Sequence, residues 1–200
     1  MSYRLSIPRM SAAAVLTIFS AVSVSSAGAQ VAGHQTEHHA QTAQIRIPEA
    51  MHAEHAEIHS ELVNATKIPG RVGAAARALD AVLAPHFARE EQIALPPLGL
   101  LAPLSRGQFT PGMRDVLPMT DSLRAELPRM LEEHKAVAAA TQRLREAARA
   151  AGNTAVLNFA DKLSLHAQSE EELFYPAALL VGEVVRSRSA APAAPAARPR

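Results

Sequence analysis

Residues 86–96 read HFAREEQIALP, and residues 166–176 read HAQSEEELFYP. Both stretches have a histidine, a glutamate four residues later and a proline ten residues after the histidine, at a separation of 80 residues. Residues four apart on an α-helix lie one turn above each other on the same face. Each stretch therefore predicts a helix that presents an imidazole and a carboxylate together.

A second pair of matching stretches extends this repeat. Glu54 and His55 recur as Glu133 and His134, at a separation of 79 residues. This echo indicates two related helical hairpins. Apolar periodicity predicts their helices at residues 48–66, 72–95, 116–150 and 154–185.

The connections between these helices set the expected topology. Short links follow the first and third helices and contain Pro69-Gly70 and Gly152-Asn153, which is typical of antiparallel neighbours. The fold class is therefore predicted to be all-α, an antiparallel up-down four-helix bundle. The longer connection between the second and third helices is rich in proline and glycine and could cap one end of the bundle. Pro118 and Pro128 predict that the third helix kinks or restarts.

Each predicted helix carries a histidine within its apolar stripe. At about 100° per residue, four sets of residues share a face. These sets are Met51, His55, Ile58 and Leu62; Leu79, Leu83, His86, Glu90 and Ile93; Leu127, Leu131, His134 and Ala138; and Phe159, Leu163, His166, Glu170 and Leu173. Four histidines and two glutamates are thus expected to face the core.

Burying these ionisable groups without compensation costs several kcal/mol for each charged group. A pair of metal ions supplies the compensation, because imidazole and carboxylate groups are ligands of iron, manganese and zinc. The alternative is a bundle without metal, since a single inward histidine is more often a hydrogen-bonded core residue. The joint pattern favours metal, and the predicted ligands are His55, His86, Glu90, His134, His166 and Glu170. Glu91, Glu171 and Glu172 lie beside the stripes and are expected to be solvated or to orient ligand imidazoles.

Over residues 47–185 the chain resembles the hemerythrin-like family, also called the HHE cation-binding domain. Its pattern is a histidine on the first helix, HxxxE on the second, a histidine on the third and HxxxE on the fourth. The matching residues are His55, His86 with Glu90, His134, and His166 with Glu170. The resemblance implies a non-haem centre of two iron ions, bridged by Glu90 and Glu170, with two histidines on each side. Manganese and zinc are the alternative metals.

One departure from the family concerns the number of histidines. Oxygen-carrying hemerythrins have five, with an HxxxH pair on one helix, but here Ala138 lies four residues after His134. The first helix does contain HxxxH, as His55 and His59, with His52 nearby. His59 is therefore a candidate fifth ligand, and the alternative is a surface histidine.

The resemblance implies a protein that binds dioxygen or a related small diatomic ligand rather than an enzyme. Two alternatives use the same centre. One is a redox enzyme acting on peroxide or nitric oxide, or an iron-delivery and repair protein; the other is a zinc or manganese buffer. No separate acid-base pair or nucleophilic triad is visible, so any reaction would occur at the metals.

Composition excludes several other classes of protein. The chain has no cysteine, which removes disulfides, iron-sulfur clusters and thiolate metal sites. Its formal net charge is +1, and no basic stripe with interleaved aromatics indicates nucleic-acid binding. Nothing in the sequence indicates an oligomeric state.

The predicted organisation has four segments. Residues 1–29 have the charge, apolar stretch and small-residue site of a secretory signal peptide. Residues 30–45 are expected to be a flexible polar leader, residues 46–185 the bundle, and residues 186–200 a disordered Ala/Pro/Arg tail. The expected location is periplasmic or secreted, without membrane insertion after cleavage.

Overall fold

The computed structural model describes residues 45–190, which lie within one compact unit. The predicted signal peptide, nearly all of the predicted leader and residues 191–200 of the predicted tail lie outside the described residues. The described part of the chain is helical and contains no strand, which confirms the all-α prediction. None of its helices has both the length and the apolar character needed to cross a bilayer.

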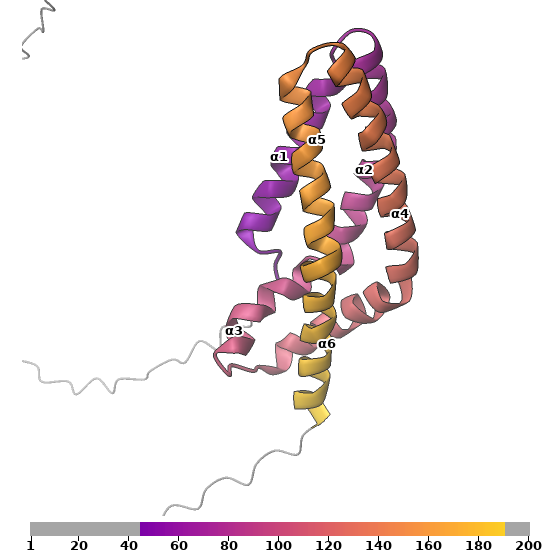
Figure 1. Cartoon of the computed structure of the whole chain (residues 1–200). Coiled ribbons are helices and arrows are strands. Elements are labelled where there is room, and N and C mark those ends of the chain that lie inside the picture. Colours follow the sequence, from indigo (N-terminus) through magenta and orange to yellow (C-terminus); the bar gives the residue numbers. More distant parts are fainter. Residues whose placement is uncertain (1–44, 191–200) are drawn as a thin grey trace, which may run out of the picture. The chain divides into compact units, whose positions relative to one another are not determined.

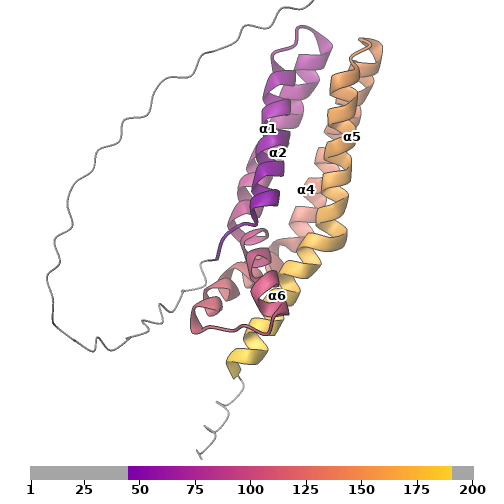
Figure 2. The same cartoon turned by 90° about the vertical axis from the view of Figure 1, so that its left-hand side faces the viewer.

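Two helical hairpins form the bundle. Helix α1 (Glu49–Thr66) lies beside α2 (Arg71–Ile93), and α4 (Leu117–Ala150) lies beside α5 (Thr154–Ser169) (Figure 1). Figure 2 shows the two hairpins facing each other. Contacts join α1 to α2, α2 to α4, α4 to α5 and α5 to α1, so the four helices enclose one core. The predicted antiparallel four-helix bundle is confirmed.

The hairpin links use glycine where the chain must reverse. Gly70 has φ of 75° and Gly152 has φ of 63°, in the left-handed region that residues with a Cβ rarely adopt. Asn153 then caps α5, because its side-chain oxygen accepts a hydrogen bond from the Val156 N–H at 3.1 Å. In both hairpins the second helix therefore begins within a few residues of the end of the first.

The long connection closes one end of the bundle, as predicted. It contains three short helices, namely η1 (Pro96–Leu100), α3 (Leu101–Ser105) and η2 (Pro111–Val116). Leu100, Met113 and Val116 from this connection are buried together with Val181 and Val185 from α6 (Tyr175–Ala190). The apolar side chains of the connection thus complete a core around the end of the last helix.

The third predicted helix does not restart at its prolines. Helix α4 is continuous from Leu117 to Ala150. Pro118 lies in its first turn, where the helix needs no backbone N–H from it, and Pro128 is tolerated inside the helix. The inward face of α4 also differs from the prediction, because Ala138 is exposed whereas Val137 is buried.

The last helical stretch contains a π-helix that the sequence pattern did not predict. Residues Glu170–Phe174 form this π turn between α5 and α6, and the Tyr175 N–H donates to the Glu170 carbonyl. In a regular α-helix a residue five positions later is rotated by about 140° from the first. The wider π turn instead brings Tyr175 to the inward face at 1% exposure, whereas Leu173, predicted to be in the core, is 61% exposed.

Helix α6 continues past Val185, where the bundle was predicted to end, as far as Ala190. Arg186 forms an ion pair with Asp121 of α4. The Ser189 hydroxyl accepts a hydrogen bond of 3.1 Å from Arg114 Nε. These side-chain contacts with earlier parts of the chain explain why the helix extends into the stretch predicted as a disordered tail.

The approach of α6 to α4 predicts one stability effect. A Cβ added to Gly182 would lie 2.4 Å from Thr120 Oγ1 and 2.7 Å from Thr120 Cβ. Gly182→Ala should therefore lower the free energy of unfolding by about 1–3 kcal/mol, through overpacking. Chemical denaturation measures this difference. Gly112→Ala is the control, because a Cβ there meets no atom within 4 Å. Equal unfolding free energies for the two variants would contradict the predicted close packing.

Candidate metal centre

The six side chains predicted as ligands converge inside the bundle. They lie on every long helical stretch: His55 on α1, His86 and Glu90 on α2, His134 on α4, His166 on α5, and Glu170 at the start of the π turn. All six are buried, and Glu90 and Glu170 are 0% and 1% exposed. The predicted convergence of these residues is therefore found in the structure.

One group of donor atoms, the first cluster, consists of His86, Glu90, His134 and Glu170. His86 Nε2 lies 3.2 Å from Glu90 Oε1. His134 Nε2 lies 3.4 Å from Glu170 Oε2 and 3.9 Å from Glu90 Oε1. These distances place two imidazole nitrogens and one oxygen of each carboxylate around one point.

A second group, the second cluster, consists of His55, His166 and Glu170. His166 Nε2 lies 2.9 Å and His55 Nε2 lies 3.5 Å from Glu170 Oε1. The other Glu90 oxygen, Oε2, lies 3.9 Å from His55 Nε2. The two oxygens of Glu170 therefore face different clusters, and those of Glu90 are similarly divided.

Several inward atoms have no hydrogen-bond partner within the described residues. The buried atoms without partners in the two clusters are His55 Nε2, His86 Nε2, His166 Nε2, Glu90 Oε2 and Glu170 Oε1. Buried polar groups are rarely left in this state, because each one loses its hydration. Two ligands bound at right angles to one metal ion at about 2.1 Å lie roughly 3 Å apart. The donor types and their separations thus fit a metal-binding site.

An outer ring of glutamates holds the imidazoles from the other side. Three of its members hydrogen-bond to Nδ1 atoms: Glu91 with His55 at 3.3 Å, Glu133 with His86 at 2.9 Å, and Glu171 with His134 at 2.7 Å. Glu54 lies 3.2 Å from His166 Nδ1 as an ion pair without the alignment of a hydrogen bond. Each carboxylate comes from a neighbouring helix, so this outer ring passes once around the bundle. A proton held at Nδ1 leaves the Nε2 lone pair directed inward, as a metal ligand requires.

Sequence reasoning found only part of this outer ring. Glu91 and Glu171, expected to be solvated or to orient imidazoles, contact histidines, whereas Glu172 is exposed and accepts a hydrogen bond from Gln168. Glu54 and Glu133 were not assigned to the ring. The repeated Glu-His pair on the first and third helices pointed to both glutamates. Each of them, however, contacts a histidine on another helix and not the histidine beside it in the sequence.

The charges of the cage shift the pKa values of its members. Burial lowers the pKa of His134, but its contacts with the carboxylates of Glu170, Glu90 and Glu171 outweigh this effect and raise the pKa to about 10. Burial raises the pKa of Glu170, but its contacts with His134, His166 and His55 hold that pKa well below the ordinary value. In the metal-free protein these shifts favour a protonated His134 beside an ionised Glu170.

Tyr175 also enters the cage, which sequence reasoning missed because the π turn is not visible in the apolar pattern. Its hydroxyl donates a hydrogen bond to Glu90 Oε1 and lies 3.1 Å from His134 Nε2. Burial and the neighbouring Glu90 charge raise the pKa of Tyr175, so the hydroxyl remains a donor in the metal-free protein.

The surplus histidines of α1 lie outside the cage. His52 and His59 are exposed and, with His55 and Glu91, line a hollow between α1 and α2. Neither belongs to the clusters of potential ligand atoms, so the structure does not support His59 as a fifth ligand.

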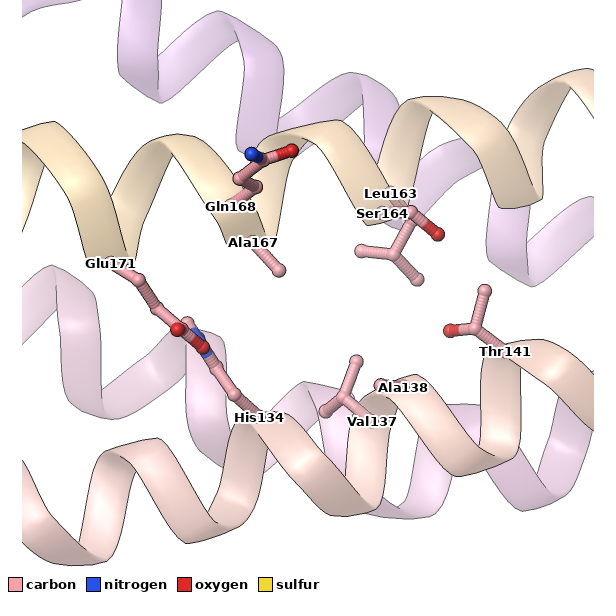
Figure 3. Close-up of a pocket in the computed structure, with 9 residues that line it drawn as sticks. All are labelled: His134, Val137, Ala138, Thr141, Leu163, Ser164, Ala167, Gln168 and Glu171. Atoms are coloured by element: carbon pink, nitrogen blue, oxygen red, sulfur yellow. The ribbon is translucent and has the colours of Figure 1, made fainter.

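A second hollow, of about 220 Å³, lies between α4 and α5. Figure 3 shows His134 and Glu171 near one end and Thr141 near the other, with Ala138 in the wall. Its lining is mainly apolar, and the buried Thr141 hydroxyl has no hydrogen-bond partner within the described residues. The hollow therefore extends from the surface to the outer edge of His134.

Comparison with known families identifies one match. The model of the hemerythrin HHE cation binding domain matches residues 34–178. This match begins before residue 46, where the bundle was predicted to start, and residues 34–44 lie outside the described part of the chain. No curated protein and no solved structure matches.

The outer ring predicts an effect on metal affinity. Glu133→Gln removes the charge beside His86 Nδ1 and should weaken metal binding about 10–100-fold. Competition with a chromophoric chelator measures this change for zinc or iron. Glu132→Gln is the matched control, because the adjacent Glu132 is exposed and, among residues 45–190, pairs only with Lys135. If both variants bind as tightly as the wild type, the outer ring does not orient the ligands.

The pKa shifts predict how the stability of the metal-free protein depends on pH. The pKa of His134 is raised from 6.5 to about 10. Its contribution to the free energy of unfolding is therefore complete below pH 6.5 and is lost as the pH rises from 6.5 to about 10. The effect of Glu170 on stability has the opposite pH dependence. Its contribution to the free energy of unfolding is complete above its ordinary pKa of 4.5 and is lost as the pH falls below that value. Thermal unfolding should therefore show decreasing stability on the alkaline side, and His134→Gln should flatten that decrease. Stability that rises over the same range would contradict this assignment.

Proposed function

Because the chain belongs to the hemerythrin HHE cation-binding domain family, we propose that it binds two iron ions and, through them, dioxygen or a related small diatomic ligand. The observation that carries the proposal is the convergence of partnerless buried nitrogen and oxygen atoms in two clusters that share Glu170. Such groups need cations that accept both nitrogen and oxygen donors. Bound iron would supply a redox-active centre to which a diatomic molecule can be attached.

The protein side chains have different roles at this centre. In the proposed arrangement His86 and His134 would hold one ion and His55 and His166 the other, and Glu90 and Glu170 would offer carboxylate oxygens on both sides. The outer ring fixes the imidazole orientations, while Phe87 stacks on His55 with ring centroids 4.0 Å apart. All six side chains are buried, so they have little contact with bulk water.

The hollow beside the cage favours small neutral molecules as ligands. The hollow between α4 and α5 has a mainly apolar wall and ends at the edge of His134 (Figure 3). A hollow with mainly apolar surface favours a diatomic gas over a charged substrate, because a charged molecule would lose part of its hydration there. This supports a gas ligand for the proposed centre.

A zinc or manganese buffer is the second candidate function. The exposed His52 and His59 beside the outer edge of His55 favour it, because imidazoles at the mouth of a hollow can deliver a metal ion. Zinc also binds nitrogen and oxygen sites more tightly than ferrous iron. Two zinc ions per chain, retained after growth with sufficient iron, would favour the buffer over the gas-binding function.

The location of the protein is a separate proposal. The charged start, apolar stretch and small-residue site within residues 1–29 support export to the periplasm or the exterior. N-terminal sequencing of the protein recovered from cell fractions tests this proposal: a start near Gln30 supports cleavage, and an intact N-terminus in the cytoplasm contradicts it.

The proposed centre predicts the iron content of two glutamate variants. The wild type should bind two iron ions per chain after anaerobic reconstitution, and Glu170→Ala should lose iron because it removes the oxygens shared by both clusters. Glu172→Ala is the matched control, since Glu172 is on the same π turn but exposed. Metal analysis and the ultraviolet-visible spectrum report both results. Equal iron content in the two variants would contradict the proposed ligand set.

The same preparation separates a binding protein from an enzyme. Reduced protein exposed to dioxygen should change its spectrum and recover the original spectrum when the gas is removed. Sustained consumption of peroxide or nitric oxide above the rate of free iron would instead support the catalytic alternative.

A further inference from the structure

Tyr175 is a buried polar side chain inside the cage that the proposed function does not yet use. Its hydroxyl donates to Glu90 Oε1 and lies 3.1 Å from His134 Nε2. The phenol ring stacks on His134, with centroids 5.6 Å apart and an interplanar angle of 29°. The oxygen of Tyr175 thus lies among the donor atoms of the first cluster and belongs to the same inward-facing set.

The backbone places Tyr175 there through the π turn. In a regular α-helix the five residue steps from Glu170 to Tyr175 would rotate the phenol about 140° away from the Glu170 side chain. The hydrogen bond from the Tyr175 N–H to the Glu170 carbonyl closes the wider turn and keeps both side chains inward. Isolated π turns occur frequently at functional sites, so this position requires an explanation.

The internal repeat shows that the other half of the bundle has no equivalent hydroxyl. Leu95 lies 80 residues before Tyr175, and the Leu95 N–H donates to the Glu90 carbonyl at 3.0 Å. This hydrogen bond matches the one from Tyr175 to Glu170. A backbone hydrogen bond from the residue five positions later therefore follows both glutamates, although after Glu90 it closes the end of α2, beside a bond of 2.8 Å from the Ala94 N–H, and is not part of a π turn. One of the two segments places a phenol at this position and the other a fully buried aliphatic side chain.

We propose that the Tyr175 oxygen is a further ligand of the metal ion in the first cluster. The proposal rests on the proposed metal centre and extends it. Because Leu95 offers no such donor, the two metal positions differ in their protein ligands. The ion between His55 and His166 then has one protein ligand fewer.

The chemistry of the phenol fits this role. Phenolate is an oxygen donor that protein-bound iron accepts, and metal binding generally displaces protons from its ligands. When Tyr175 binds, its O–H bond breaks, the proton leaves to solvent, and the oxygen electron pair bonds to the metal. No oxidant or reductant is needed for this step.

The chain is well suited to a spectroscopic test, because it has two tyrosines, Tyr3 and Tyr175, and no tryptophan. Full-length protein loaded with ferric iron should show a visible phenolate-to-iron charge-transfer band with resonance-enhanced phenol vibrations. Tyr175→Phe should lose both signals and keep two irons per chain. The matched control, Tyr3→Phe, should retain the wild-type spectrum. An iron-loaded Tyr175→Phe protein with an unchanged spectrum overturns the proposal.

Isotope labelling tests the assignment without altering Tyr175. Ring-deuterated tyrosine incorporated into the Tyr3→Phe protein should shift the enhanced vibrations, since Tyr175 is then the only tyrosine. If two irons bind and no vibration shifts, the tyrosine ligand is wrong while the proposed iron centre stands. If neither ferrous nor ferric iron binds, and zinc produces no ultraviolet difference spectrum of ionised tyrosine, both proposals fail.

Discussion

Two carboxylates buried at the centre of the bundle determine much of what surrounds them. Glu90 and Glu170 are almost completely removed from solvent, and charges in such a position require compensation within the protein. Four histidines surround them, one from each long helical stretch, and the pKa values of His86, His134 and His166 are raised by the nearby carboxylates. The outer ring of glutamates then balances the imidazoles. The burial of the carboxylates thus connects the packing of the bundle to the chemistry of its core.

The helical bundle and the six convergent side chains were predictable because their signals are local. A histidine and a glutamate four residues apart share a helix face wherever the helix forms. The repeated stretches around His86 and His166 also revealed the two hairpins without information about their contacts. Apolar periodicity located the helices to within a few residues, since it is a property of each segment alone.

Features that depend on contacts between helices, or on a change in helix type, were not predictable in this way. Glu54 and Glu133 reach histidines on other helices, so their roles depend on how the helices are aligned. The π turn exchanges Leu173 for Tyr175 on the inward face, and regular periodicity across Glu170 gave the wrong residue. These departures all concern the cage itself, where local structure deviates from the pattern that formed the rest of the bundle.

The most direct test of the proposed two-metal cage is an anomalous difference map from crystals of the iron-loaded protein, measured at the iron absorption edge. Two peaks are expected, one within the first cluster and one within the second, with Glu170 between them. Two such peaks would establish that the buried carboxylates are balanced by metal ions. A well-ordered cage without an iron peak, or iron only at surface histidines, would contradict the account.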